Sequence, residues 1–540
     1  MHKTSFGKSE DRPAFFPMQN STLFLSSTKR IFEADNSPNP ADIQELSDTL
    51  DSLPETDDNK QQSLTILVNF LLKNKQTNPT TLPLLVLIKK LGRSTLLQDH
   101  DLDKNKILAL IHYAQHSLKQ NSLKDQNLLD ILSEILTIFA NQILLEPTTS
   151  NIFIQADGIS IISASLTAEF NSSIIYFLCA RILFLVLHNG LDPIEVVEGL
   201  HIPDLLSSAV TKLVNPSNAV EIQNHSQINT AMATSEIYKA LYIIFMLYEK
   251  TTRIEDITQK PSIQSHFGYI IAPEKYQYFK RTLETALSFL TDKSNIDKHP
   301  KSCISAIQVL FLFPIAPIDE ILQAWLSKND GFALIDSLVS VLENQLKNHN
   351  FDKLKSLNPI TIQEQAEDFP IVCVLGRMCL ADEASRNHLY DCIFKGRDFS
   401  KLPEEGDSIR AKLTKIVGSP MQSEFSLAVG DFLYVLCNSS TSLFTQNLGF
   451  GNTAGYLNAR SLLISEINVD VNLPAQPSFL ANPITGTDEN YNREIEKELE
   501  TMTDEEKERE AERLFVLFDK LNRTGIIKVQ PQFGNPNNEK

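Results

Sequence analysis

The chain has 540 residues, of which 42% are hydrophobic and only 18 are glycine, and its formal net charge is −18. Such a length exceeds the usual size of one compact core, and the scarcity of glycine argues against an all-β sandwich or barrel, which is rich in turns. A surface this acidic repels phosphate backbones and anionic lipids, so we expect neither nucleic acid nor a membrane surface as a partner.

Residues 1–60 are polar and broken by prolines, which predicts a weakly ordered N-terminal lead with one short helix over Asp42–Leu53. Over residues 61–447, apolar residues recur at i, i+3, i+4 and i+7, which predicts helix after helix. The predicted helices cover residues 64–71, 82–91, 107–117, 128–144, 174–187, 236–248, 274–290, 302–313, 318–326, 333–346, 371–380, 408–416 and 425–437.

Two or three of these helices recur about every 40–45 residues, a spacing typical of armadillo or HEAT repeats. The sequence therefore predicts an all-α, armadillo/HEAT-like helical-repeat superhelix (a solenoid) over residues 61–447, and its length favours this over an irregular all-α globule. Two polar insertions, 215–234 and 348–368, are expected as surface loops. Such a superhelix has a concave groove that suits a peptide or a helix.

The C-terminal part divides into a glycine-containing segment and linker, 448–501, and an amphipathic helix with a tail, 502–540. Thr503 and Glu506 have the spacing of a capping box, which starts this helix. Its apolar face consists of Ala511, Leu514, Phe515, Phe518 and Leu521. Either the helix packs back on its own solenoid, or it binds a partner.

The sequence contains no pattern that indicates catalysis. It lacks a GxxxxGK[ST] phosphate loop and a GxSxG nucleophile elbow. His112 and His116 are four residues apart, but no third metal ligand is evident near them. We therefore expect no catalytic residue, no cofactor and no metal.

The six cysteines form no CxxC motif, and five of them lie inside apolar runs, which is typical of reduced thiols in a reducing compartment. The N-terminus has no signal-peptide pattern, and no apolar run reaches the roughly 18 residues that span a bilayer. We expect a cytoplasmic protein without a transmembrane segment.

Four C-terminal motifs follow one another in a characteristic order. They are LPEEGDSIRAKLTKIV, VGDFLYVLCNSSTSLFTQNLGFGNTAGYLNARSLL, NPITG and MTDEEKEREAERLFVLFDKLNRTGII, within residues 402–527. In this order they resemble the synembryn family, whose members are cytosolic guanine-nucleotide exchange factors and folding chaperones for heterotrimeric G-protein α subunits. The resemblance is specific over about a quarter of the chain. It implies an armadillo-like superhelix that grips the C-terminal helix of the α subunit in its groove, so that GDP leaves.

The resemblance also implies groove residues. Lys89 and Arg93, one turn apart in LIKKLGRS, would hold acidic groups of the partner helix, although a solvated basic pair is an alternative. Asn141 occupies the place of a groove asparagine, or else caps its own helix. Arg181 lies in an apolar helix and needs either an ion-pair partner, which we favour, or a groove position. Where another asparagine is expected, this chain has Ile243.

For the C-terminal helix, the resemblance implies a second grip, on the nucleotide domain of the α subunit, through Leu514, Phe515, Phe518 and Leu521. Gly449, Gly451 and Gly455 with the following link would form its tether. The expected protein is thus a monomeric two-site clamp that its partner recruits to the cell cortex. A generic armadillo scaffold or transport adaptor is the alternative. Ser461 replaces a family glycine, and the link has few hydroxyls, which leaves control by phosphorylation open.

Overall fold

The computed structural model contains only helices and one isolated antiparallel bridge, Asn482 with Thr487, in the residues that it describes. These are residues 16–33, 38–50, 58–74, 77–92, 100–119, 125–168, 172–215, 227–252, 273–313, 332–349, 351, 362–419, 422–462, 482, 484–509 and 511–512. The chain forms two compact units. Unit 1 comprises residues 1–257 and 269–314, and unit 2 comprises residues 258–268 and 315–540.

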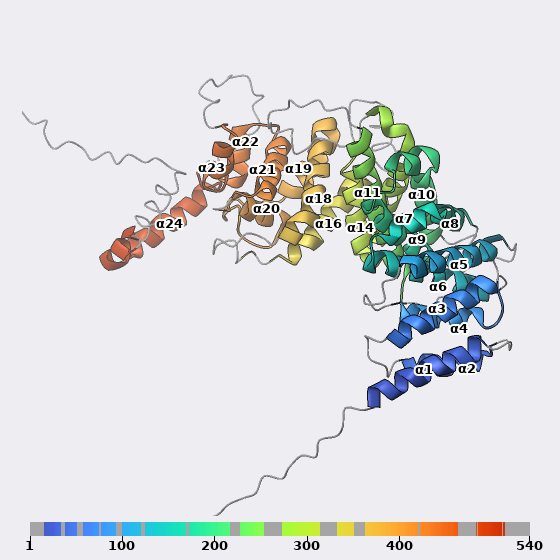
Figure 1. The fold of residues 1–540 in the computed structure, drawn as a ribbon. Coiled ribbons are helices and arrows are strands. Elements are labelled where there is room, and N and C mark those ends of the chain that lie inside the picture. The colour runs from blue at the N-terminus through green and yellow to red at the C-terminus, as the bar shows by residue number, and fades with distance from the viewer. Residues whose placement is uncertain are drawn as a thin grey trace, which may run out of the picture. The chain divides into compact units, whose positions relative to one another are not determined.

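Unit 1 is a stack of helices in two layers (Figure 1). Each repeat consists of one helix from layer A and one from layer B, which pack on each other. Within a layer, each helix also packs beside the helix of the next repeat. Layer A consists of α2 (Pro40–Leu50), α4 (Thr81–Leu91), α6 (Gln126–Leu145), α9 (Ser173–His188), α11 (Thr230–Thr252) and α14 (Pro300–Leu310). Layer B consists of α1 (Phe16–Phe32), α3 (Asp58–Lys73), α5 (His100–Lys119), α8 (Gly158–Thr167), α10 (Ile202–Val214) and α12 (Lys280–Thr291).

Shorter helices connect the two layers of unit 1. They are α7 (Thr149–Gln155), η1 (Glu195–Gly199), η3 (Pro273–Tyr278) and α13 (Ser294–Lys298). The helices of layer A from α4 to α14 begin at residues 81, 126, 173, 230 and 300, so successive starts are 45, 47, 57 and 70 residues apart. The first two intervals are close to the predicted repeat, and longer connections lengthen the later ones. The prediction of an all-α helical-repeat solenoid is confirmed.

Local sequence explains where the central helices begin. The Asp125 carboxylate accepts a hydrogen bond from the backbone N–H of Asn127 and caps α6, and the Ser172 hydroxyl accepts one from Ile175 and caps α9. The apolar faces that follow are almost fully buried, because neighbours in the same layer and in the other layer cover them. The described helix α6 is long and apolar enough to span a bilayer, but 56% of that apolar window is buried inside the protein, as in a core helix.

The N-terminal lead differs from the prediction. Instead of one short helix, it contains α1 and α2, and these pack on α3 and α4 as a first repeat. Phe24 and Ile43 are buried in this contact, and the rings of Phe32 and Phe70 meet edge to face. Of the prolines that this structure describes in the lead, Pro40 opens α2 in the first turn, where its missing N–H costs nothing.

Unit 2 surrounds two central helices, α18 (Ile362–Ala381) and α21 (Glu424–Leu436), which pack along each other. The helices around them are α16 (Ala333–Lys347), α19 (Glu383–Phe394), α20 (Ile409–Val417), α22 (Thr441–Leu448) and α23 (Phe450–Ala459), followed by α24 (Glu489–Thr501). The expected loop over 348–368 is shorter than predicted, because α18 already begins at Ile362. The expected helix over 318–326 lies outside the described residues.

Candidate functional site

Layer A carries charged side chains that pair from one helix to the next. The first pair joins Lys89 on α4 to Glu134 on α6, with 2.8 Å between Nζ and Oε1. Both side chains are about one-fifth exposed, at 17% and 22%. Of the two basic residues that the resemblance implied, Lys89 is therefore an ion-pair partner within the fold, and Arg93 lies outside the described residues.

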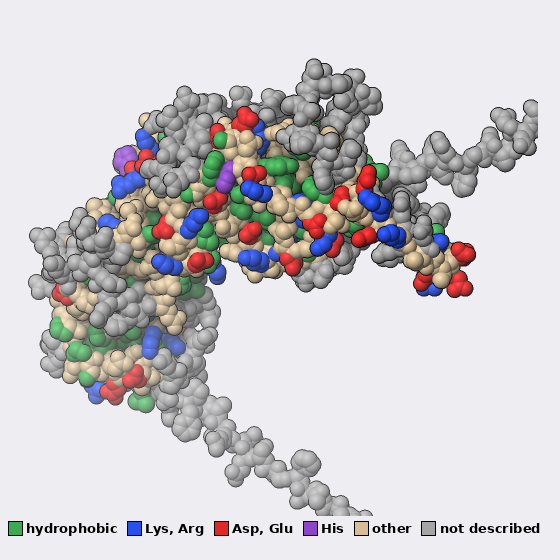
Figure 2. Space-filling view, turned by 180° about the vertical axis from the view of Figure 1, so that it is seen from behind, with side chains coloured by type: hydrophobic (Ala, Val, Ile, Leu, Met, Phe, Trp, Pro, Cys, Tyr) green, Lys and Arg blue, Asp and Glu red, His purple; other side chains and the backbone are tan. Residues whose placement is uncertain are grey.

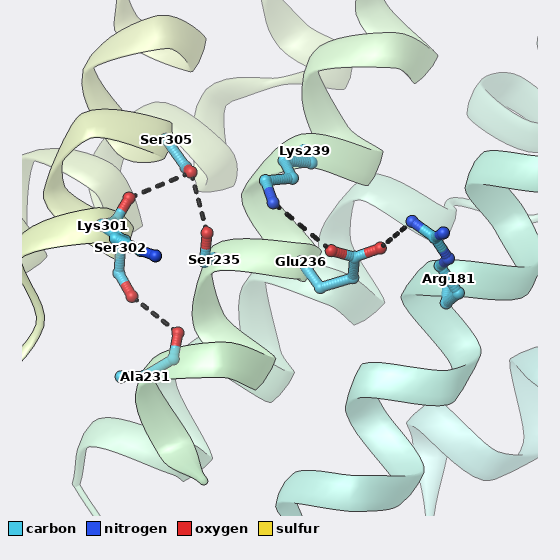
Figure 3. A network of polar contacts seen from close by, with 8 residues as sticks. All are labelled: Arg181, Ala231, Ser235, Glu236, Lys239, Lys301, Ser302 and Ser305. Carbon is cyan, nitrogen blue, oxygen red and sulfur yellow. Dashed lines mark hydrogen bonds and ion pairs between the residues drawn. The ribbon is translucent and has the colours of Figure 1, made fainter. Parts of the chain in front are cut away.

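A second pair joins the next two helices of the layer (Figure 3). Arg181 on α9 donates from Nη1 to Oε1 of Glu236 on α11 at 3.1 Å, and Lys239 approaches the other carboxylate oxygen at 3.6 Å. Glu236 is only 7% exposed, whereas Arg181 is 37% exposed and also lies over the ring of Phe184. The ion pair that we favoured for Arg181 is present, and its guanidinium remains partly open to solvent.

Hydroxyl groups continue this series of contacts from α11 to α14. Ser235 and Ser305 share a hydrogen bond of 3.0 Å, and Ser302 donates to the backbone carbonyl of Ala231 at 2.8 Å (Figure 3). We call the cross-helix pairs Lys89–Glu134 and Arg181–Glu236 the polar ladder, together with Lys239, which contacts Glu236 within α11. Buried polar groups that find partners on a neighbouring helix fix the register between helices, so the ladder orders the layer.

Among the described helices, none packs on one face of layer A, and the ladder runs along this face. Layer B covers the opposite face and neighbouring helices cover the flanks, so the partly exposed positions of each helix mark its free face. Some of these positions recur every three or four residues and so share one side of their helix. They include Leu82, Val86 and Lys89 on α4, Glu134, Thr137 and Asn141 on α6, Phe177, Arg181 and Leu185 on α9, and Lys239, Ile243 and Met246 on α11.

The free face thus includes Lys89, Asn141 and Arg181, the described residues that the resemblance implied as groove contacts. It also includes Ile243, which stands where the resemblance led us to expect an asparagine. Asn141 does not cap its helix, because α6 ends at Leu145 with Glu146 as its cap. In the described part of the chain, the Asn141 side-chain amide has no hydrogen-bond partner, so both its donor and its acceptor remain for a ligand. Charged groups alternate with aliphatic side chains here, and such a mixture suits an amphipathic helix.

The C-terminal motifs are held together by a buried ion pair in unit 2. Asp431 of VGDFLY is fully buried and accepts from Arg460 Nε at 2.8 Å and from the Tyr456 hydroxyl at 2.9 Å. The Tyr456 ring covers Gly430 so closely that a Cβ there would lie 2.3 Å from the ring. The motif residues Gly430, Asp431, Tyr456 and Arg460 therefore fasten α23 onto α21.

The NPITG motif docks on the junction between α22 and α23. Gly449 has φ of +77°, and a Cβ on it would lie 2.8 Å from the carbonyl oxygen of Thr485. Gly451 donates its N–H to the Ile484 carbonyl at 3.2 Å, and Arg397 donates to the carbonyl oxygens of Asn447 and Gly486. Residues 482–487 are here called the docked motif.

These contacts correct the expectation that the glycines form a tether. Gly449 permits a left-handed turn and a close backbone approach, and Gly451 and Gly455 lie inside helix α23. The glycines of this segment could indicate either flexibility or tight packing, and at Gly449 the lack of a side chain allows tight packing.

The last predicted helix is described only at its start. Thr503 and Glu506 form the predicted capping box, with Thr503 N to Glu506 Oε2 at 3.0 Å and Glu506 N to Thr503 Oγ1 at 3.3 Å. These hydrogen bonds hold the pKa of Glu506 below its usual value. Leu514, Phe515, Phe518 and Leu521 lie outside the described residues.

Sequence reasoning missed the acidic half of the polar ladder. Glu134 and Glu236 follow Lys89 and Arg181 by 45 and 55 residues, which is about one repeat. A glutamate that follows a basic residue by about one repeat, on the next helix of the layer, is a pattern that could have identified Glu134 and Glu236.

On the face drawn in Figure 2, acidic and basic side chains are interspersed over the described surface and form no basic stripe. The described histidines His112 and His116 on α5 have no third metal ligand beside them.

Comparison with known proteins supports one family. A family model for the guanine nucleotide exchange factor synembryn matches residues 84–537. The chain is 22% identical to the rat protein named chaperone Ric-8A over 461 residues, which make up 82% of this chain and 81% of the rat protein. The bovine protein of that name is 23% identical over 463 residues, with the same coverage. The chicken protein is 34% identical, but over only 143 residues, 24% of this chain and 25% of the chicken protein.

Proposed function

This chain belongs to the family of the guanine nucleotide exchange factor synembryn, and on that premise we propose that it promotes nucleotide exchange on heterotrimeric G-protein α subunits and assists their folding. In this proposal the C-terminal helix of the α subunit binds along the free face of layer A. The alternation of charged and aliphatic side chains on four consecutive helices of that face is the observation that carries the proposal.

Three features of the face support a helix with acidic groups as its ligand. Arg181 offers several N–H donors, and only Nη1 is committed to Glu236. Lys239 is half exposed and its contact with Glu236 is long, at 3.6 Å, so it can turn toward a ligand carboxylate. The unpartnered amide of Asn141 can bind a peptide group through both donor and acceptor. Leu82, Phe177 and Met246 would cover the apolar side of the helix.

Exchange of this kind requires no covalent chemistry. The chain stabilises the nucleotide-free α subunit by binding it more tightly than the GDP-bound form, and this difference in affinity shifts the population toward the empty state. The exchange factor therefore needs neither a catalytic residue nor a nucleotide site. The same binding energy protects a newly made α subunit that has not yet acquired nucleotide, which is the physical basis of a chaperone role.

The proposal is tested by GDP release from purified α subunits with and without the full chain. We expect faster release, and no acceleration of an α subunit that lacks its last helix. Charge reversal by Arg181→Glu with Lys239→Glu should weaken binding of a peptide with the sequence of that helix at least tenfold. Lys73→Glu is the matched control, because Lys73 is exposed on α3 in layer B and should leave binding unchanged.

The second grip through residues 502–540 is tested separately. Deleting residues 491–540 should reduce exchange more than it reduces binding of the isolated peptide, because only the intact α subunit would contact both sites. Equal losses would leave a single site. If the chain binds the peptide but accelerates GDP release from no α subunit, then the alternative of a peptide-binding scaffold replaces the exchange proposal.

A further inference from the structure

Three side chains with different ligand atoms converge on the surface of unit 2. Asp336 lies on α16, and His388 and Cys392 lie one turn apart on α19, which packs beside α16. His388 Nε2 is 2.7 Å from Asp336 Oδ1 and 3.6 Å from Cys392 Sγ, and all three ligand atoms lie within 4.8 Å of one another. In the described part of the chain, no other group of three potential metal ligands is so close.

The same three residue types also occur in nucleophilic triads, but the geometry here excludes that role. In a triad the nucleophile gives its proton to one ring nitrogen of the histidine, while the carboxylate accepts a hydrogen bond from the other ring nitrogen. In this protein the carboxylate oxygen and the thiol sulfur both approach Nε2. Asp336 therefore occupies the nitrogen that would have to accept the proton of the thiol, and it does not hold the opposite one. Three ligand atoms that point to one place are instead what a bound cation requires.

The distances suit a tetrahedral ion. With a metal–nitrogen bond of about 2.0–2.1 Å and a metal–sulfur bond of about 2.3 Å, a tetrahedral zinc site separates nitrogen and sulfur by about 3.5–3.6 Å. The observed separation of Nε2 and Sγ is 3.6 Å, so these two ligands need no movement. Asp336 must move back by about 0.6 Å to reach the nitrogen–oxygen separation of about 3.3 Å in such a site. The side chain is 38% exposed, and a small rotation suffices.

The surroundings fix the histidine and favour a cation. The ring of Phe332 stacks on that of His388 at 4.2 Å with an interplanar angle of 10°, which orients Nε2 toward Asp336. Glu343 lies seven residues after Asp336, two turns further along the same side of α16, and Asp391 precedes Cys392. These two acids add negative charge near Cys392, and water would complete the coordination.

We propose that Asp336, His388 and Cys392 bind a zinc-class divalent cation that links α16 to α19. One nitrogen, one oxygen and one sulfur ligand suit Zn²⁺ or Co²⁺ and disfavour Mg²⁺ and Ca²⁺, which take oxygen ligands. The ion would replace the hydrogen bond between His388 and Asp336, and it would join two helices whose ligands are 52 residues apart. It would therefore stabilise unit 2, independently of the α-subunit surface in unit 1.

The test uses the full chain after treatment with a chelator and its removal. Titration with Co²⁺ alone should produce a thiolate-to-cobalt charge-transfer band and the visible bands of a tetrahedral ion, saturating at one equivalent. Cys392→Ser should abolish the charge-transfer band. His388→Gln and Asp336→Asn should each weaken Co²⁺ and Zn²⁺ binding at least about tenfold, the loss that even outer-shell changes cause.

Asp391→Asn is the matched control, because it removes a neighbouring negative charge without removing a ligand, and the charge-transfer band should remain. Zn²⁺ should raise the unfolding temperature of the unmodified chain but not that of Cys392→Ser, with circular dichroism showing that the variant is folded. The proposal is overturned if no charge-transfer band forms, or if Co²⁺ and Zn²⁺ affinities are the same in Cys392→Ser and the unmodified chain.

Discussion

Replacing Arg181 by methionine and, separately, Glu236 by glutamine should destabilise unit 1 by unequal amounts, although each change breaks the same ion pair. Methionine keeps most of the apolar stem of Arg181 but leaves the Glu236 carboxylate, which is 7% exposed, with only Lys239 at 3.6 Å. A charge left in a buried site without its main partner costs several kcal/mol when burial is complete. Because Lys239 remains, we expect a loss of about 2 kcal/mol.

Glu236→Gln instead removes the buried charge and leaves the exposed partner, Arg181, without its carboxylate. The neutral amide is nearly the same size as the carboxylate and still accepts a hydrogen bond, while Arg181, 37% exposed, is solvated by water. The cost is then that of one partly exposed ion pair, about 1 kcal/mol or less. The asymmetry between the two variants follows from which partner is buried, and it does not depend on the absolute strength of the pair.

The assay is native-state hydrogen exchange of the α9 and α11 amides, because the chain has two compact units and one global unfolding curve would mix them. We expect exchange to accelerate roughly 30-fold in Arg181→Met and about fivefold or less in Glu236→Gln. An equal or larger effect of Glu236→Gln would refute the reasoning, because it would mean that Glu236 is hydrated and that the ladder does not order layer A.

Three further outcomes are expected. Asp431→Asn should destabilise unit 2 by about 3 kcal/mol or more, measured by hydrogen exchange of the α21 and α23 amides, because it leaves a buried guanidinium without its carboxylate. Tyr456→Phe should cost only about 1 kcal/mol, and equal losses would contradict the assignment. Gly449→Ala should expose the docked motif to proteolysis, because φ of Gly449 is positive and the added Cβ would meet the Thr485 carbonyl. Gly451→Ala should leave the motif protected, because the nearest atom to its added Cβ is 3.9 Å away. At pH 8, an alkylating reagent should modify Cys392 alone in the metal-free native protein, because Cys392 is exposed whereas the other five thiols are buried. Modification of a second thiol before unfolding would contradict this.

Much of this fold can be predicted because helix formation is a local property. The period of apolar residues marks α4, α6, α9 and α11, since a buried helix face needs apolar side chains every three or four positions whatever it packs against. The capping box at Thr503 is equally local, because its two hydrogen bonds join residues three apart. The order of the C-terminal motifs identified the family without any knowledge of the structure.

The tertiary structure decided what these residues do. The sequence favours an ion pair for Arg181 and leaves the role of Lys89 open, but it names no partner for either. Each meets an acid 45 or 55 residues further along, and only the stacking register of the helices brings the two together. Gly449 read as a hinge, but its missing side chain makes room for the Thr485 carbonyl. Asp336 and His388, 52 residues apart, gave no local pattern. One-dimensional spacing determines which face of a helix is buried, whereas pairing between faces depends on where the next helix lies, and only the folded chain specifies that.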